Sequence, residues 1–296
     1  MRPTPGLREA SKDTIGNRSE GGSNRNAPRP RIGLALGGGF ARGIAHVGVL
    51  RVLARYGIPV HAIAGVSAGA IVASAFASGA SADEIGLVGA SMRFKDVASW
   101  RLSTMGLARS ECMTRFLRRL LKKSAFEEMQ VPLAVVATDL ATGDPVIFGG
   151  KGDVSLPIRA SCSYPGLFQP VVHNGRFLVD GAMSMEIPAG PLRSMGVDRV
   201  VSVHLPMRRN AGAPDNMLQV VNRCFQIMQR QTEGAWRRQS DLVIAPEVSE
   251  TAWDAFGNAE QLIEAGEKAA LAAIPRILSW MAAPARRFEK LAPSAA

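Results

Sequence analysis

Short apolar runs of strand length alternate along this chain with segments of helical spacing. Residues 31–36 and 58–63 are mostly apolar, which predicts two buried strands. Residues 44–55 and 70–77 follow them and place apolar and small residues as a helix requires. Because strands and helices alternate in this way, the pattern predicts a single α/β domain.

The two ends of the chain do not share this pattern. Residues 1–30 are rich in Arg, Asn, Gly, Ser and Pro, and bury too little apolar surface to offset the entropy lost on ordering. They lack the apolar core of a secretory signal, and their acidic residues argue against an organelle transit peptide. We therefore expect a disordered basic tail at 1–30, one folded domain at 31–283 and a C-terminal tail at 284–296.

Composition narrows the partners and the compartment. The 296-residue chain is 47% hydrophobic and carries a formal net charge of +10, which suits a phospholipid surface, nucleic acid or an acidic protein. Low aromatic content and scattered arginines argue against nucleic acid. Cys112, Cys162 and Cys224 form no close pair, so we predict no disulfide framework and no metal site. We expect a reducing, cytoplasmic setting, and the sequence leaves the oligomeric state open.

The segment Gly65-Val-Ser67-Ala-Gly69 has the spacing of a nucleophile elbow. A serine on a sharp strand-to-helix turn is held in a strained backbone conformation, and glycines on both sides leave room for it. An alternative is that the uncharged residues 62–82 cross a bilayer, with the two glycines at the spacing of packed membrane helices. Their Ala, Gly and Ser composition and the missing aromatic belt favour a helix buried behind a sheet.

A glycine loop follows the first predicted strand and opens the first predicted helix. This arrangement presents backbone N–H groups to an anion. A dinucleotide is excluded because Phe40 or Arg42 falls where a glycine is required, and a nucleotide P-loop is excluded because no Gly-Lys-Ser/Thr follows. The remaining candidate is the oxyanion of a tetrahedral acyl intermediate. In a parallel sheet this loop and the elbow would lie side by side.

A reactive serine also needs a base. Of the four histidines, His204 is the one that follows a plausible aspartate, so a triad of Ser67, Asp180 and His204 is one hypothesis. Asp180 itself ends a predicted strand and is followed at once by Gly181. A partly desolvated carboxylate there can act directly as general base. The alternative is that this Asp-Gly pair is merely a turn.

Several blocks in the same order and spacing resemble the patatin-like phospholipases. The similarity covers about residues 31–203, with a weaker echo at 241–246. The blocks are Leu36 to Leu50 (LGGGFARGIAHVGVL), Ala64 to Gly69 (AGVSAG), Val135 to Asp144 (VVATDLATGD), Arg159 to Pro170 (RASCSYPGLFQP) and Phe177 to Ala182 (FLVDGA).

The resemblance, to a compact bacterial member of that family, implies a three-layer α/β/α sandwich with a mainly parallel central sheet. It implies a serine acyl hydrolase that cleaves fatty acyl esters of phospholipids or lysophospholipids without cofactor or metal. Ser67 would be the nucleophile and Asp180 the general base of a dyad. The backbone amides of Gly38, Gly39 and Phe40 would form the oxyanion hole.

The resemblance also assigns supporting positions and marks two departures. Phe40 stands where relatives often have a glycine, and residues 183–186 replace an Asn-bearing stretch, so substrate preference stays open. Residues 159–170 are expected to pack under the site. The supporting motif residues are Gly37, Arg42, Gly43, Gly65, Gly69 and Gly181.

Residues 113–123 form a basic amphipathic stretch. Such a helix can lie on an anionic membrane surface near the site, as a peripheral contact. We favour an ordinary helix whose apolar stripe packs in the core and whose cations face solvent. A further alternative for the whole chain is a non-catalytic adaptor that binds lipid or protein on the same fold.

Overall fold

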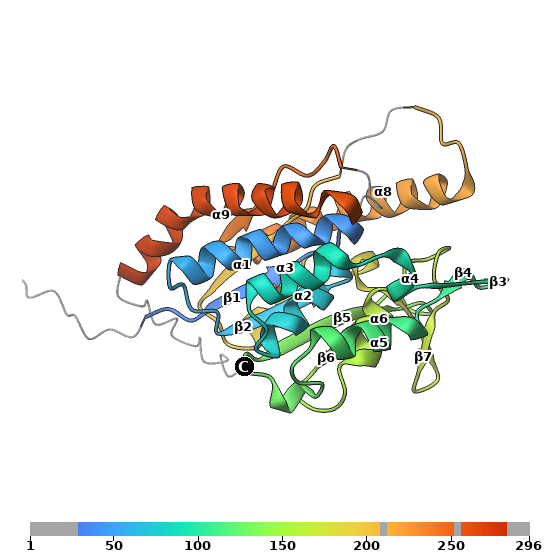
Figure 1. Ribbon diagram of the computed structural model, residues 1–296, viewed down its shortest axis with the longest axis horizontal. Helices are drawn as coiled ribbons and strands as arrows, with labels where there is room; N and C mark the ends of the chain where they lie inside the picture. The colour runs from blue at the N-terminus through green and yellow to red at the C-terminus, as the bar shows by residue number, and fades with distance from the viewer. Residues whose placement is uncertain (1–28, 208–211, 252–255, 283–296) are drawn as a thin grey trace, which may run out of the picture.

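The computed structural model describes residues 29–207, 212–251 and 256–282. The predicted tails at 1–30 and 284–296 fall almost entirely outside these ranges, so they stay predictions, as do the domain boundaries drawn from them. The described residues form an α/β structure around one central sheet (Figure 1).

The central sheet has eight strands and is mixed. Its order is β10-β9-β1-β2-β5-β8-β7, with β6 paired to β5. The pairs from β10 to β5 are parallel, whereas β6, β7 and β8 pair antiparallel to their neighbours. The strands are β1 (Ile32–Leu36), β2 (Ala62–Val66), β5 (Leu133–Asp139), β6 (Pro145–Gly149), β7 (Val171–His173), β8 (Arg176–Asp180), β9 (Arg199–Val203) and β10 (Leu242–Ile244).

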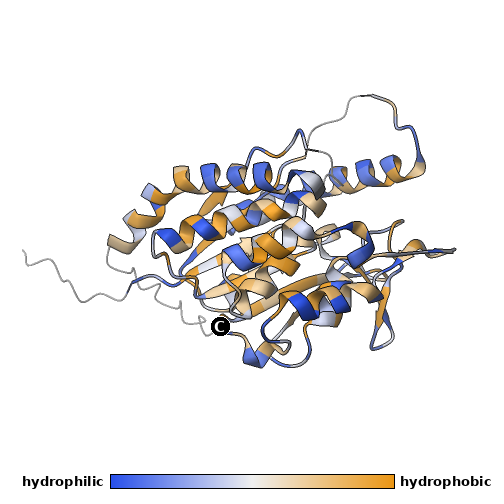
Figure 2. Cartoon of the chain, viewed as in Figure 1, coloured by the Kyte–Doolittle hydropathy of each residue, from blue (hydrophilic) through white to orange (hydrophobic). Residues whose placement is uncertain are grey.

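Helices cover both faces of this sheet, so the fold has three layers. On one face, apolar residues of the sheet pack in one large core with α1 (Ala45–Arg55), α2 (Ala68–Ala77), α3 (Ala82–Ser91), α5 (Glu111–Leu120) and α9 (Ala259–Ala282). On the other face, a smaller core joins the sheet to α7 (Ala189–Ser194) and to Trp236 of α8 (Met217–Arg238). Figure 2 shows hydrophobic residues gathered along the central strands and on the helix sides that face them.

Shorter elements complete the chain. The helix α6 (Ser155–Ser161) packs against β5 and β8, and α4 (Phe94–Val97) packs against α5. A separate hairpin, β3 (Ser99–Ser103) and β4 (Gly106–Arg109), projects from one end of the molecule (Figure 1). Within the described ranges, 3-10 turns lie at η1 (Phe40–Ile44), η2 (Phe126–Glu128), η3 (Gly181–Met183) and η4 (Phe256–Asn258).

The predicted α/β class is confirmed, but one predicted strand is wrong in its bounds. The strand expected at 58–63 is β2, and it runs from Ala62 to Val66. Pairing with β1 sets this start, because Gly33 is the first residue of β1 that lies opposite a residue of β2, Ala62. Residues 62–82 therefore form β2, the elbow and α2. No helix among the described residues is long and apolar enough to cross a bilayer.

Candidate active site

Ser67 occupies the sharp turn between β2 and α2. Its backbone has φ 54° and ψ −126°, a conformation that L-residues rarely adopt and that surrounding structure must enforce. A side chain at position 65 would put its Cβ 2.5 Å from the carbonyl oxygen of Gly69 and 2.6 Å from Ala70 Cα. A side chain at position 69 would collide with the carbonyl oxygen of Leu36. Both glycines are therefore required by close backbone approach, as the elbow motif predicts.

Ser67 and Asp180 are in direct contact. The Ser67 hydroxyl donates a 2.7 Å hydrogen bond to Asp180 Oδ2, and the two residues are only 8% and 1% exposed. The other carboxylate oxygen, Oδ1, accepts the backbone N–H of Ala182 at 3.0 Å. The carboxylate is thus fixed by one main-chain donor and aimed at one hydroxyl.

Pairing along β5 explains why two residues 113 positions apart meet. Val136 of β5 lies opposite Val66 at the end of β2, and the next residue, Ala137, lies opposite Asp180 at the end of β8. The strands β2 and β8 therefore follow one another along the same edge of β5, with their ends adjacent. Beside this junction, Thr138 Oγ1 donates to the Asp180 carbonyl at 2.9 Å and holds the end of β8.

The Asp180 carboxylate has an unusual pKa. Burial raises the pKa from its ordinary value of 3.8 to about 7, and the hydrogen bonds from Ala182 and Ser67 offset only part of this effect. A carboxylate whose pKa lies near neutral pH can both accept and return a proton under ordinary conditions.

The glycine loop lies beside Ser67. A Cβ added at Gly38 would lie 3.3 Å from Ser67 Cβ. The loop carbonyls are held elsewhere, since His46 Nε2 donates to the Gly37 oxygen at 2.8 Å and the Arg42 N–H donates to the Gly39 oxygen at 3.1 Å. Within the described residues, the amides of Gly38 and Gly39 donate no hydrogen bond. Two main-chain donors therefore stand next to the serine without a protein acceptor.

Two buried polar side chains support this loop. Burial lowers the pKa of His46 to about 4, so its ring is neutral at pH 7, with the Nε2 proton directed at the loop. Arg42 is buried as well and donates to the carbonyls of Gly39 and Pro206 at 3.3 and 3.2 Å. Its guanidinium joins the loop to the segment after β9, so Arg42 has a structural role here.

The remaining motif glycines permit close packing around the site. A Cβ at Gly43 would lie 2.5 Å from Ala68 Cβ, the residue after the serine, and one at Gly37 would lie 2.5 Å from Ile187 Cδ1. A Cβ at Gly181 would collide with the carbonyl of Val136.

Ser161 is a site residue that the sequence did not identify individually. Its hydroxyl accepts the Ser67 N–H at 2.8 Å and donates to the Val136 carbonyl at 2.6 Å. It lies within residues 159–170, the block expected to pack under the site. In the same block, the backbone carbonyl of Ser163 accepts the Asp180 N–H at 3.0 Å. The resemblance thus indicated the segment, while the contact itself depends on the fold.

His204 is placed away from the serine. Its Nε2 lies 3.2 Å from Glu186 Oε1, and its ring lies beside Trp236. Asp180 contacts the serine directly, with no imidazole between them. This geometry does not favour the triad hypothesis, in which His204 would bridge Ser67 and Asp180. Within the described ranges, no cluster of three or more His, Cys, Asp or Glu residues is placed to hold a metal ion.

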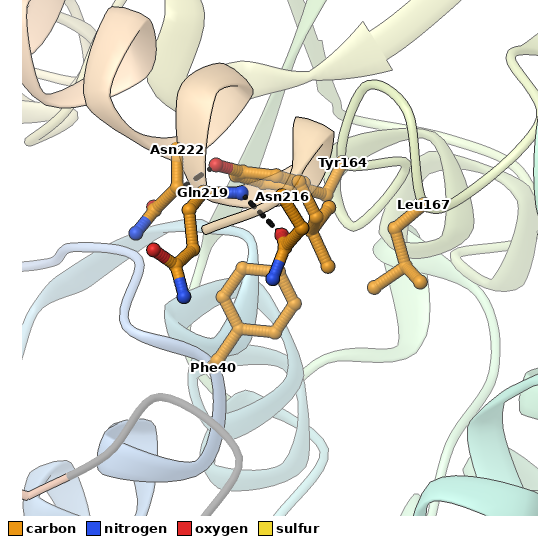
Figure 3. Close-up of a pocket in the computed structure, with 7 residues that line it drawn as sticks. Phe40, Tyr164, Leu167, Asn216, Gln219 and Asn222 are labelled. Atoms are coloured by element: carbon orange, nitrogen blue, oxygen red, sulfur yellow. Dashed lines mark hydrogen bonds between the residues drawn. The ribbon is translucent and has the colours of Figure 1, made fainter. Parts of the chain in front are cut away.

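Phe40, whose φ of 50° is unusual for a residue with a side chain, lines several cavities. One of them contains both Ser67 and Asp180 together with Gly38 and Gly39. Two others differ in the chemistry of their lining. The first, which we call the apolar cavity, reaches Ser67 and is lined by side chains that include Ile71, Met92, Phe94, Met113 and Phe168. The second, the amide pocket of Figure 3, is lined by Phe40, Tyr164, Leu167, Asn216, Leu218, Gln219 and Asn222. The Phe40 ring packs edge-on against Tyr164, with 4.9 Å between the ring centroids, and Phe40 lines both of these cavities.

The fold and the site together define a class of protein: an α/β/α sandwich that holds a serine, a carboxylate and a glycine loop at the ends of neighbouring strands. Within that class, a family model described as patatin-like phospholipase matches residues 34–193. That match covers more than half of the sequence, and the chain belongs to the patatin-like phospholipase family.

Individual relatives are similar over part of their length. An uncharacterised NTE family protein of Mycobacterium tuberculosis is 34% identical over 184 residues, covering 61% of this chain and 51% of that protein. A lysophospholipase of Aspergillus fumigatus is 29% identical over 180 residues, covering 58% of this chain and 12% of that protein. This chain thus spans about half the length of the mycobacterial relatives that it matches.

Among solved structures, VipD from Legionella pneumophila is similar with a TM-score of 0.50 and 12% sequence identity, over 86% of this chain and 67% of VipD. At this identity the likeness concerns the fold alone.

Proposed function

We propose that this protein is a serine acyl hydrolase that cleaves fatty acyl esters of phospholipids or lysophospholipids. Ser67 is the nucleophile and Asp180 the general base. The observation that carries the proposal is the 2.7 Å hydrogen bond from the Ser67 hydroxyl to a buried carboxylate whose pKa burial raises to about 7. A positioned base with this pKa can take the hydroxyl proton as the oxygen attacks.

The mechanism has two half-reactions. Ser67 Oγ attacks the ester carbonyl while its proton moves to Asp180 Oδ2, and the amides of Gly38, Gly39 and Phe40 receive the charge on the carbonyl oxygen. Each such donor is worth roughly 100- to 1000-fold in rate. The protonated carboxyl then gives its proton to the alcohol oxygen as the ester bond breaks. The alcohol departs, and the acyl group stays bound to Ser67. A water molecule, deprotonated by Asp180, releases the fatty acid by the same steps.

The two cavities suit the two parts of a lipid ester. The apolar cavity places only apolar side chains and Cys162 beside Ser67, which favours a hydrocarbon chain there. The amide pocket carries Asn216, Gln219 and Asn222, which suits the polar part of the substrate. The lysophospholipase among the relatives supports the same substrate class. We also infer that the protein meets its substrate at an anionic lipid surface rather than binding nucleic acid.

The decisive experiment replaces the nucleophile. We expect Ser67→Ala to abolish hydrolysis of lysophospholipid and of a soluble p-nitrophenyl ester, with an unchanged circular dichroism spectrum. Ser74→Ala is the matched control, because Ser74 is a buried serine of α2 whose hydroxyl has no partner within the described residues. Labelling with a fluorophosphonate probe should modify Ser67 in the wild type and in this control. Full turnover by Ser67→Ala, or a folded wild type without adduct, would reject the proposal and favour the adaptor.

A further inference from the structure

The charge of this protein is concentrated in one segment. Residues 93–123, which comprise α4, the β3–β4 hairpin, α5 and the residues just after it, contain nine Lys and Arg and only two acidic residues. The segment has a net charge of +7, against +10 for the whole chain. We call it the basic segment. Such a concentration of one sign attracts an anionic surface and orients the protein toward it.

The hairpin within the basic segment exposes apolar side chains. Trp100 of β3 is 69% exposed, and Met105, between the two strands, is 51% exposed. Figure 1 shows that β3 and β4 project beyond the body of the molecule, so these side chains are available to a partner. A tryptophan beside cationic residues is typical of elements that enter the boundary between lipid headgroups and acyl chains.

The helix α5 supplies charge and no apolar contact. The apolar stripe of the stretch 113–123 is buried in the core and does not face lipid. Its residues in α5 are Met113, Phe116, Leu117 and Leu120. The prediction of an ordinary helix with its apolar side in the core is therefore confirmed. On the opposite side, three exposed arginines carry no ion pair within the described residues: Arg115, Arg118 and Arg119.

Aromatic rings connect the exposed hairpin to the nucleophile. The centroids of the Trp100 and Phe94 rings are 5.1 Å apart, and those of the Phe94 and Phe168 rings are 6.3 Å apart. Phe94 and Phe168 both line the apolar cavity, and Ser67 is also part of its lining. The exposed Trp100 ring is therefore in contact with a residue that lines the same cavity as Ser67.

We propose that the basic segment is a docking face for an anionic phospholipid bilayer. Trp100 and Met105 enter the interface, the arginines of α5 lie over anionic headgroups, and the acyl chain of a bound lipid passes beside Phe94 into the apolar cavity. This last step rests on the proposed function, whereas docking itself does not. The exposed tryptophan and the apolar cavity behind it favour a bilayer over a nucleic acid or an acidic protein, which would need only the charge.

The test measures binding of the full chain to vesicles by sedimentation. All proteins carry Ser67→Ala, so that no lipid is hydrolysed during the measurement. We expect binding to vesicles with equal phosphatidylglycerol and phosphatidylcholine to be at least about tenfold tighter than to pure phosphatidylcholine, and to weaken with salt. Trp100→Ala should weaken binding at every salt concentration, because it removes apolar contact and leaves the charge unchanged.

A matched pair of charge reversals locates the face. Arg118→Glu with Arg119→Glu should weaken binding by about tenfold or more. The control pair is Lys268→Glu with Arg276→Glu, which makes the same change of net charge on exposed positions of α9. In Figure 1, α9 lies across the molecule from α5. This control should bind vesicles with an affinity close to that of the Ser67→Ala protein. Equal losses from both pairs would overturn the proposal, because they would mean that overall charge drives binding. Loss from neither pair, or no effect of Trp100→Ala, would overturn it too.

Hydrolysis of a soluble short-chain ester by the wild type separates this proposal from the proposed function. A wild type without esterase activity whose Ser67→Ala form still binds vesicles as expected would reject the function and support the docking face. An active esterase whose vesicle binding shows no preference for anionic lipid would support the function and reject the docking face. Tighter binding to an RNA homopolymer than to anionic vesicles, unchanged by Trp100→Ala, would also overturn the docking face.

Discussion

Ser161 Oγ accepts the backbone N–H of Ser67 at 2.8 Å while it donates to the carbonyl of Val136 at 2.6 Å. One buried hydroxyl thus joins the strained backbone of Ser67 to the strand β5. The carboxylate depends on the same strand, because Asp180 lies opposite Ala137. The relative placement of Ser67 and Asp180 is therefore set by β5.

The first prediction concerns this hydroxyl. Ser161→Ala leaves a buried donor and a buried acceptor without a partner, so we expect a loss of about 1–3 kcal/mol in the free energy of unfolding, measured by urea denaturation. We also expect kcat to fall, because the Ser67 backbone loses a contact that holds its conformation. Ser78→Ala is the control: its buried hydroxyl bonds Ala75 and Lys122, remote from the site, so it should lose stability with no change in kcat. A kcat of Ser161→Ala equal to that of the wild type would contradict a positioning role for Ser161.

The pH dependence of hydrolysis follows from the Asp180 pKa of about 7. The base must be ionised to accept the Ser67 proton, so kcat/KM should be low at pH 5, rise through about pH 7 and level off above pH 8. The measurement uses a neutral soluble ester, whose own charge does not change over this range. A profile that is flat from pH 5 to pH 8 would mean that the base titrates elsewhere.

The raised pKa of Asp180 also predicts how stability depends on pH: stability falls over the pH range in which activity rises. Between the ordinary pKa of 3.8 and the raised value of about 7, folded Asp180 keeps a proton that the unfolded chain releases. This contribution to stability is therefore complete at low pH and is lost as the pH rises through 7. Asp180→Asn removes the titrating group, so its Tm should increase relative to the wild type from pH 4 to pH 8, while its activity falls by about 100- to 10,000-fold. A constant Tm difference across that range would argue against a raised pKa.

Phe40 should control the size of substrate that is accepted. Phe40→Gly removes a ring from the lining of both the apolar cavity and the amide pocket, and glycine also suits the positive φ at this position. We expect kcat/KM for a bulky two-chain ester to rise by about tenfold relative to a single-chain ester, since pocket contacts of this size change selectivity by roughly 10- to 200-fold. Phe40→Leu, which keeps a large apolar side chain, should stay close to the wild type. An unchanged ratio in the glycine variant would show that the ring does not limit the substrate.

His204 distinguishes a dyad from a triad. Because His204 contacts Glu186, we expect His204→Ala to keep kcat within about threefold of the wild type, whereas loss of a triad base costs several orders of magnitude. Loss of the imidazole removes one partner of the buried Glu186 carboxylate, so a lower Tm is expected with the retained activity. Steady-state kinetics on the soluble ester measures kcat of the variant. A thousandfold loss of kcat would support the triad of Ser67, Asp180 and His204 instead of the dyad.

Much of the site could be predicted because its parts are local. The glycine loop follows β1 and the elbow follows β2, and each depends on backbone conformations and close approaches within a few residues. The two strands are neighbours in the sheet, with Leu36 opposite Gly65, so the two motifs meet as parallel pairing requires. Asp180 could also be recognised locally, as a carboxylate at a strand end followed by a glycine.

The sequence by itself determined the class of fold, the strained turn at Ser67 and the glycine loop beside it, because periodicity and glycine spacing act over short stretches of chain. It offered Asp180 as a candidate carboxylate and left a simple turn as the alternative. Only the tertiary structure decided which groups surround them. The antiparallel approach of β8 to β5 brings Asp180 to Ser67, α6 delivers Ser161 beneath them, and His204 goes to Glu186 instead. These contacts join residues 18, 94 and 113 positions apart. Strand pairing and core packing fix them, which no local pattern records.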